Sequence, residues 1–211
     1  LPVTVEREIG PDATTNRVYD GDGRLTAVDF DNLDYDLAWD PTRAVPQILE
    51  ACVDDNLWAR FVSGDERVGY QLVVDVPTDP ATSTVGFGVY GYNVDGSVIP
   101  TDSTVTTAGG YDPFGNPYAP PNASFWLGYR GEAHIDGLIH LRNRDYDPAT
   151  GTFTSVDPLD GTSGSPTQTN PYHYADNDPV NRVDPLGLSP CSRWPSTVLG
   201  FHIGTWACNN I

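Results

Sequence analysis

Turn-forming residues break this sequence at short intervals, and they constrain its fold more than any other feature. The turn dipeptides Asp20-Gly21-Asp22-Gly23 lie between Val18-Tyr19 and the run Leu25 to Val28, a pattern that predicts a β-hairpin. Strand-like runs and turns go on alternating over residues 68–112. The chain has 21 glycines and 19 prolines among 211 residues, and 24 Asp against 5 Glu. Because turns favour Gly, Pro and Asp while helices favour Glu, Lys, Ala and Leu, we predict an all-β fold built of successive hairpins.

Residues 33–39 show the pattern of a half-buried strand. The apolar residues Leu33, Tyr35, Leu37 and Trp39 alternate there with polar ones that include Asp34 and Asp36. A period of two places the apolar side chains on one face of a strand and the aspartates on the other. We therefore expect one face of this strand to meet solvent.

A helix competes with strands in only one segment, residues 40–62. Six apolar residues recur there at helical spacing: Val45, Ile48, Leu49, Cys52, Val53 and Leu57. Pro46 would lie inside that helix, where its missing N–H and the clash of its ring cost roughly 3 kcal/mol. A short helix near residues 47–58 stays open beside the strand interpretation.

The charge of the chain limits its partners. Its 29 acidic and 11 basic residues give a formal net charge of −18 at pH 7. Nucleic acids and anionic membranes bind clustered cations, because these release the condensed counterions. No apolar run approaches the 18 residues of a membrane-spanning helix. We expect neither a nucleic-acid partner nor a membrane span.

No pattern predicts a metal or another cofactor. Read from Asp20, the acidic hairpin fails the calcium-loop template, since Arg24 and Leu25 fall where a ligand and the turn glycine should be. The three cysteines lack CxxC spacing and the histidines lack HxxxH spacing. We expect all four histidines to be surface or core residues: His134, His140, His173 and His202.

Three segments toward the carboxyl end carry motifs in a fixed order. They are YDPFGN from Tyr111, GLIHLRNRDYDPATGTFTSVDPLDG from Gly137 and NPYHYADNDPVNRVDPLGL from Asn170. Together with the hairpin after Arg17 and the segment WDPTRAVPQIL from Trp39, this set resembles the carboxyl-terminal core of Rhs (rearrangement hot spot) and YD-repeat proteins. That family includes bacterial polymorphic toxins and teneurin-like shells. The resemblance covers about residues 17–188.

The resemblance implies a three-part organisation. Residues 1–122 would be a YD-repeat-like hairpin segment, residues 123–188 the Rhs-associated core, and residues 189–211 a short variable tail. In such proteins the hairpins coil into a hollow β-shell that the core closes at one end, and the protein is secreted or displayed at the cell surface. Since 211 residues are too few for a shell, the expected partner is the remainder of the shell, in the same or a companion chain. Target cells or an immunity protein would meet the tail.

The resemblance also implies a bond to be cut. Related proteins cleave themselves after the Leu of an Asp-Pro-x-Gly-Leu motif. Here that motif comprises Asp184, Pro185, Gly187 and Leu188, so the scissile bond would join Leu188 to Ser189. The chain would then be an enzyme only in the single-turnover sense.

The cleavage would use an aspartic-protease-like pair of carboxylates. By the motif the pair is Asp145 and Asp157, and Arg144 would keep one member charged through bidentate hydrogen bonds. Two carboxylates that share a proton can divide the work, one activating water and the other donating to the carbonyl. Asp147 is the rival of Asp145, because residues two apart on a strand face the same side.

Other functions remain open at this point, because Asp-Pro dipeptides also form turns. The chain could be a non-catalytic structural or adhesive β-shell segment, or a carrier for a secreted peptide, residues 189–211. Within that tail, a disulfide between Cys191 and Cys208 would close a loop and stabilise it by about 3 kcal/mol.

Overall fold

In the computed structural model the regular structure of the chain is antiparallel β-sheet. The described residues are 3–9, 13–30, 33–43, 45–63, 67–74, 84–92, 96–100, 110–119, 125–159, 170–188, 190–193, 197–198, 201–202 and 206–207. Within these ranges the regular elements are strands, apart from two single-turn 3-10 helices, η2 (Tyr129–Gly131) and η3 (Ala175–Asn177). The predicted all-β fold is confirmed.

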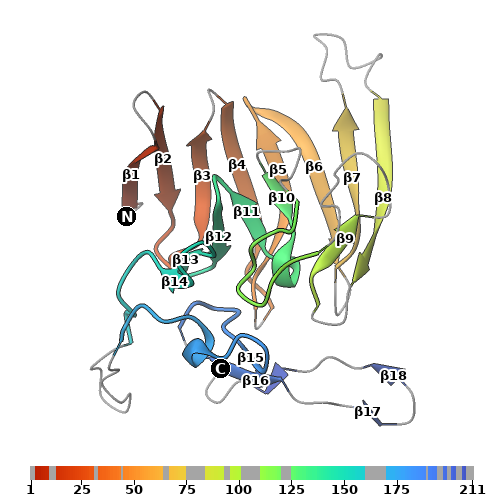
Figure 1. Cartoon of the computed structure of the whole chain (residues 1–211). Helices are drawn as coiled ribbons and strands as arrows, with labels where there is room; N and C mark the ends of the chain where they lie inside the picture. Colours follow the sequence, from red (N-terminus) through yellow and green to blue (C-terminus); the bar gives the residue numbers. More distant parts are fainter. Residues whose placement is uncertain are drawn as a thin grey trace.

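A nine-stranded antiparallel sheet forms the larger part of the fold, and its strands follow one another in chain order (Figure 1). Each strand therefore pairs with the next one along the chain, as successive hairpins require. Its strands are β1 (Val3–Ile9), β2 (Ala13–Tyr19), β3 (Leu25–Phe30), β4 (Leu33–Asp40), β5 (Gln47–Val53), β6 (Asn56–Ser63), β7 (Arg67–Val74), β8 (Thr84–Tyr92) and β9 (Val98–Pro100).

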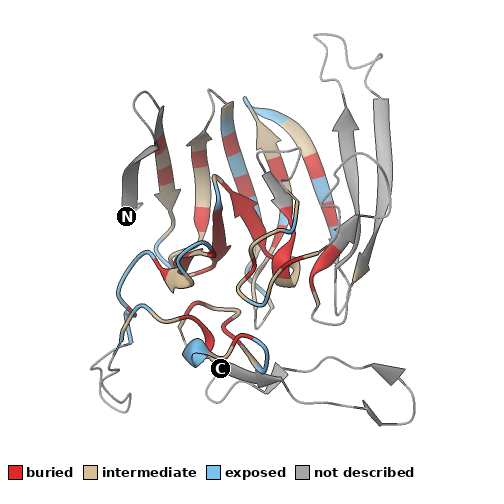
Figure 2. Ribbon diagram, in the orientation of Figure 1, coloured by how far each residue is buried: buried red, intermediate tan, exposed pale blue. Residues whose placement is uncertain are grey.

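The hairpin predicted around Asp20 is the connection between β2 and β3. Oδ1 of Asp20 accepts the backbone N–H groups of Asp22 and Arg24, each at 2.9 Å, and so closes the turn. The alternation predicted for residues 33–39 is also present in β4. There Tyr35 and Leu37 are buried, while the residues between and beside them are exposed (Figure 2).

The helix considered near residues 47–58 does not form, and a β-bulge explains why its residues recur at helical spacing. The segment contains β5, a turn at Asp54-Asp55 and the start of β6. Pairing with β4 passes from Trp39 opposite Ile48 to Ala38 opposite Glu50, which makes Leu49 the extra residue of a bulge. Ile48 and Ala51, three residues apart, are therefore both buried on the same side of a strand.

A second sheet of five short strands packs against one face of the large sheet. Its antiparallel strands are β10 (Phe125–Leu127), β11 (Ala133–Ile135), β12 (Leu138–Leu141), β13 (Arg144–Asp147) and β14 (Thr152–Phe153). Two smaller sheets follow at one end of the molecule (Figure 1). They contain β15 (Arg182–Val183), β16 (Cys191–Arg193) and β19 (Trp206–Ala207), and β17 (Thr197–Val198) with β18 (Phe201–His202).

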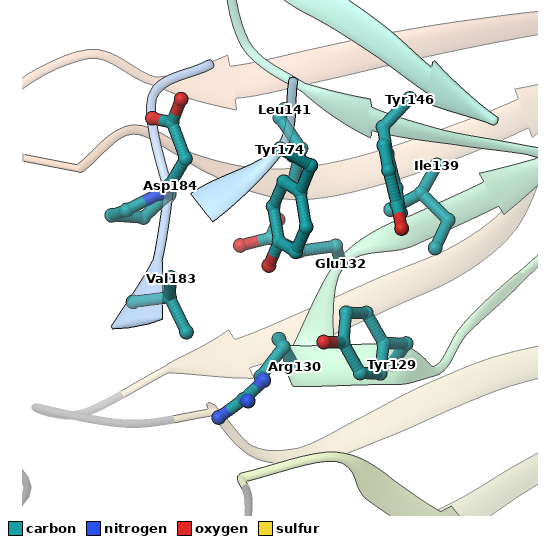
Figure 3. A pocket seen from close by; sticks show the side chains of 10 residues that line it. Tyr129, Arg130, Glu132, Ile139, Leu141, Tyr146, Tyr174, Val183 and Asp184 are labelled. Carbon is teal, nitrogen blue, oxygen red and sulfur yellow. The ribbon is translucent and has the colours of Figure 1, made fainter. Parts of the chain in front are cut away.

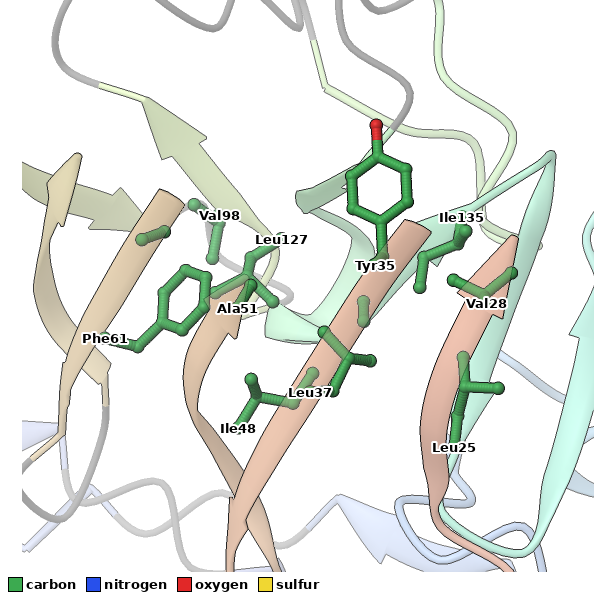
Figure 4. Close-up of a cluster of buried hydrophobic side chains, with 12 residues drawn as sticks. Leu25, Val28, Tyr35, Leu37, Ile48, Ala51, Phe61, Val98, Leu127 and Ile135 are labelled. Atoms are coloured by element: carbon green, nitrogen blue, oxygen red, sulfur yellow. The ribbon is translucent and has the colours of Figure 1, made fainter. Parts of the chain in front are cut away.

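Two hydrophobic clusters hold these layers together. The first lies between the large sheet and the strands that cover it, and joins residues such as Leu25, Ile48 and Phe61 to Leu127 and Ile135 (Figure 4). The second belongs to the five-stranded sheet, and most of its members are aromatic. It comprises Tyr111, Tyr129, Ile139, Leu141, Tyr146, Phe153, Tyr174 and Ala175. It brings residues 170–188 against β12 and β13, so the end of the motif region is anchored to this sheet.

Candidate functional site

The Asp-Pro-Leu-Gly-Leu segment, residues 184–188, folds back on itself as a turn directly after β15. The N–H of Gly187 donates to the carbonyl oxygen of Asp184 at 3.2 Å, and the N–H of Leu188 donates to Oδ1 of Asp184 at 2.9 Å. β16 then pairs antiparallel with β15. The bond after Leu188 therefore lies in the connection between these two strands, although Ser189 itself is outside the described residues.

Arg144 is a buried residue that contacts this turn. It lies in β13 with only 4% of its surface exposed, and its guanidinium carbon stacks 3.6 Å from the centroid of the Phe153 ring. Nη1 donates to the carbonyl oxygen of Pro171 at 3.1 Å. The stacking ring and the carbonyl fix the plane of the guanidinium, so its remaining N–H groups have a defined direction.

Those remaining groups bring two carboxylates together. Nη2 of Arg144 lies 3.1 Å from Oδ2 of Asp157 and 3.4 Å from Oδ2 of Asp184, and both carboxylate side chains are 2% exposed. Nε of Arg144 donates to the carbonyl oxygen of Gly187. Arg144 was expected to hold one member of the pair Asp145 and Asp157 through two hydrogen bonds, and in the structure its Nη2 alone contacts Asp157. Sequence reasoning had assigned Asp184 to the cleavage motif alone, and the structure adds it to the carboxylates on Arg144.

The backbone around Asp157 explains how it reaches this site. Its N–H donates to the carbonyl oxygen of Pro171 at 3.1 Å, and its Oδ1 accepts the N–H of Leu159 at 2.8 Å. This is the turn geometry typical of Asp-Pro segments, and it leaves Oδ2 directed at Arg144. The Asp157 side chain therefore both closes its own turn and forms the ion pair with Arg144.

The electrostatics of the cluster follow from one cation and two carboxyl groups in a buried place. Burial lowers the pKa of Arg144, while the carboxylates of Asp157 and Asp184 oppose that shift. One guanidinium balances one carboxylate.

Asp145 does not join this cluster, which corrects the predicted pairing with Asp157. Successive residues of a strand point to opposite faces, so Asp145 turns away from Arg144 and toward the large sheet. Its Oδ1 lies 2.8 Å from Nδ1 of His140. Its Oδ2 accepts a hydrogen bond from the hydroxyl of Tyr19 and lies 3.4 Å from Nη1 of Arg17.

The partners of Asp145 connect the two sheets. The N–H of Leu25 donates to Nε2 of His140 at 2.9 Å, so the ring proton is on Nδ1 and donates to Asp145. Burial raises the pKa of Asp145, but the Arg17 cation and the hydrogen bonds from His140 and Tyr19 outweigh it and lower the pKa to about 2. The carboxylate is thus an ionised structural group at neutral pH.

Asp147, the predicted rival of Asp145, forms a turn. Its Oδ1 accepts the N–H of Ala149 at 2.9 Å, and its carbonyl oxygen accepts the N–H of Gly151 at 2.9 Å. The predicted disulfide partners, Cys191 and Cys208, lie where the structure describes no side chain. That pairing stays a prediction.

A small cavity of about 40 Å³ is lined in part by Asp184 and Pro185 (Figure 3). Aromatic and charged side chains line its other walls, among them Tyr129, Arg130 and Glu132. In Figure 3 the Asp184 carboxylate points to the opposite side from Tyr129 and Arg130.

Comparisons with known proteins find relatives whose names describe nucleases. No protein-family model matches the chain. The tRNA(Glu)-specific nuclease WapA of Bacillus subtilis subsp. natto is 38% identical over 108 residues, which are 46% of this chain and 5% of WapA. The tRNA3(Ser)-specific nuclease WapA of Bacillus spizizenii is 29% identical over 195 residues, 80% of this chain and 8% of that protein. The probable deoxyribonuclease RhsB of Dickeya dadantii is 46% identical over 56 residues, 26% of this chain and 4% of RhsB.

A solved structure shares the fold. A chain in the crystal structure of TcdB2-TccC3 superposes with a TM-score of 0.53 at 22% identity, over 87% of this chain and 10% of that one. The chain thus spans a small fraction of every relative named above, and the nuclease activities in their names describe much longer proteins. Within the described ranges no helix has the length and apolar character that a membrane crossing needs.

Proposed function

We propose that this chain is the carboxyl-terminal core region of an Rhs-type protein, and that it cleaves its own backbone after Leu188. Asp157 and Asp184 would be the catalytic pair, and Arg144 would hold both. The observation that carries the proposal is the buried guanidinium of Arg144, which contacts both carboxylates and the carbonyl oxygen of Gly187. The ordered motifs and the relatives WapA and RhsB support the family assignment.

The pair would act on the carbonyl carbon of Leu188. Asp184 already accepts the N–H of Leu188 at 2.9 Å, and the carbonyl carbon of the same residue is only two bonds from that nitrogen, about 2.5 Å further. Because the substrate is part of the same chain, its effective concentration at the carboxylates is very high. No binding step is needed.

The reaction would follow the scheme of an aspartic protease. Asp157, whose Oδ2 is the nearer to Arg144, would be the proton acceptor of the pair and Asp184 the proton donor. Water adds to the Leu188 carbonyl carbon, Asp157 takes a proton from that water, and Asp184 donates its proton toward the carbonyl oxygen. When the diol intermediate collapses, the C–N bond breaks, Asp157 gives the proton it took from water to the leaving nitrogen, and one hydroxyl of the intermediate returns a proton to Asp184. The products are a Leu188 carboxyl group and a Ser189 amino terminus.

The consequence would be separation of residues 189–211 from the core. We propose that the remaining residues 1–188 form the end of a longer β-shell, whose other part lies in the same or a companion chain. The fold shared with one tenth of a chain in TcdB2-TccC3 supports a place within a larger protein. Secretion or surface display, and contact of the tail with target cells or an immunity protein, belong to the same proposal.

A purely structural role is the second candidate, and one observation favours it. Each of the four oxygens of the two carboxylates accepts a hydrogen bond, either from Arg144 or from a backbone N–H. Carboxylates that only stabilise a turn would be bonded in the same way. In that case Arg144, Asp157 and Asp184 close the end of the shell and break no bond.

Intact mass separates the two candidates. The full chain, freshly purified and also mixed with its shell, is followed over time at several pH values. Self-cleavage predicts loss of the 22.9 kDa species and a fragment whose amino terminus is Ser189. A chain that keeps its full mass under all these conditions has the structural role.

A further inference from the structure

Three consecutive residues hold three consecutive carbonyl groups of the turn before Leu188. Nη1 of Arg142 donates to the carbonyl oxygen of Pro185 at 3.0 Å. The backbone N–H and Nδ2 of Asn143 donate to that of Leu186, at 3.2 and 3.0 Å. Nε of Arg144 donates to that of Gly187. Each donor lies 43 residues before its acceptor, so the contacts form one continuous ladder.

Gly187 fits this ladder because it has no side chain. Its φ is +65°, in the left-handed region, and an added Cβ would lie 2.7 Å from the carbonyl oxygen of Leu141 and 3.2 Å from the nitrogen of Arg144. A slip of the turn by one residue in either direction would place Leu186 or Leu188 at that position. The Cβ of either leucine would then clash with the backbone of Leu141 and Arg144.

We infer that Arg142, Asn143 and Gly187 form a register clamp that selects which peptide bond meets the carboxylates. This inference rests on the proposed self-cleavage. The clamp residues hold the backbone before the scissile bond and lie outside the carboxylate pair, so they are positioning residues. The ladder sets one residue opposite each carbonyl, and the glycine excludes the neighbouring registers.

The clamp is also tied to the large sheet. Nε of Arg142 donates to the carbonyl oxygen of Pro46, just before β5, at 2.8 Å, and the guanidinium forms a buried ion pair with Glu132. The turn between β2 and β3 packs on Asn143, since a Cβ on Gly23 would lie 3.2 Å from the Cα of Asn143. The cleavage segment is therefore held in register only when the upstream sheet has folded against the core.

Two variants test the clamp in the full chain, with a matched control. Asn143→Asp removes the side-chain donor to Leu186 and changes no volume, and Gly187→Ala adds one methyl at the tight contact. Gly137→Ala is the control, because Gly137 has a similar φ of +70° and open space around its Cβ position. A misplacement of about 1 Å costs on the order of 100-fold in rate. We expect cleavage in both clamp variants to be at least about ten-fold slower, or to give fragments cut at neighbouring bonds, while Gly137→Ala keeps the rate and the site.

Hydrogen exchange of the Gly187 and Leu188 amides gives a second readout that does not depend on cleavage. The clamp predicts faster exchange of both amides in Asn143→Asp than in the starting protein, with exchange in β12 unchanged. If the starting protein never cleaves, the self-cleavage proposal is wrong and the exchange experiment alone decides the clamp. Normal cleavage at Leu188 together with unchanged exchange in Asn143→Asp would overturn the inference.

Discussion

Arg144 and Asp145 are neighbours in β13 and belong to different clusters on opposite faces of the strand. Arg144 contacts Asp157 and Asp184 beside the turn that ends in Leu188. Asp145 contacts His140 and Tyr19 beneath the large sheet. One strand therefore places a cation at the candidate site on one face and a carboxylate in the packing interface on the other.

The first prediction concerns Asp145. Asp145→Asn leaves the buried guanidinium of Arg17 without a charged partner, and breaking a buried pair of this kind costs about 3 kcal/mol. Chemical denaturation should show that loss, while the folded protein still cleaves after Leu188. Asp147→Asn, at a turn, serves as the control and should change stability far less. An Asp145→Asn protein that is fully stable and uncut would return Asp145 to the catalytic pair.

The second prediction concerns acid stability and centres on His134. Burial lowers the pKa of His134 to about 3, and its Nε2 accepts the N–H of Tyr129 at 2.9 Å. Because the folded pKa lies below the unfolded value of about 6.5, protonation favours the unfolded chain. The free energy of unfolding should then fall by about 1.4 kcal/mol for each pH unit below 6.5.

Asp145 adds a further loss at lower pH. Its pKa is depressed to about 2, so the stability it contributes is present above about pH 4 and disappears as the pH falls toward 2. Denaturation curves between pH 7 and 4 measure the His134 contribution separately. In His134→Gln, whose amide oxygen can still accept the Tyr129 N–H, the slope between pH 6.5 and 5 should flatten. An unchanged slope would contradict this explanation.

The third prediction concerns the guanidinium of Arg144. Lysine keeps the charge but not the planar fork that reaches Asp157, Asp184 and Gly187 at once. The first-order rate of cleavage in Arg144→Lys should fall by about 100-fold or more. Arg60→Lys is the control, because Arg60 pairs with Glu50 on an exposed face, and it should cleave at the normal rate. Equal rates in both variants would remove Arg144 from the mechanism.

Local turn chemistry made much of the fold predictable. The Asp20 hairpin and the alternation of β4 both follow from residue types that act over a few positions. The helix near residues 47–58 was a wrong alternative because the bulge at Leu49 shifts the strand register by one residue. That bulge depends on pairing with β4, which no local pattern reveals.

Only part of the candidate site could be predicted, because some of its contacts join segments that are distant in the sequence. Arg144 and Asp157 could be assigned because their segment resembles a motif of the Rhs core. The pairing of Asp157 with Asp184 depends on how residues 170–188 dock against β13, a contact across many residues. The sequence held one local indication that Asp184 belongs to the site: Asp184 begins the tight turn that ends at Leu188, so its carboxylate lies beside the scissile segment.

The central claim is that Asp157 and Asp184 cut the bond after Leu188, and mass spectrometry of matched chains tests it most directly. Wild type, Asp157→Asn, Asp184→Asn and Asp147→Asn are produced in parallel and their intact masses compared. The account predicts fragments ending at Leu188 for wild type and Asp147→Asn, and full-length chains for the other two. Cleavage of Asp184→Asn at the wild-type rate, or an uncut wild-type protein, would contradict it.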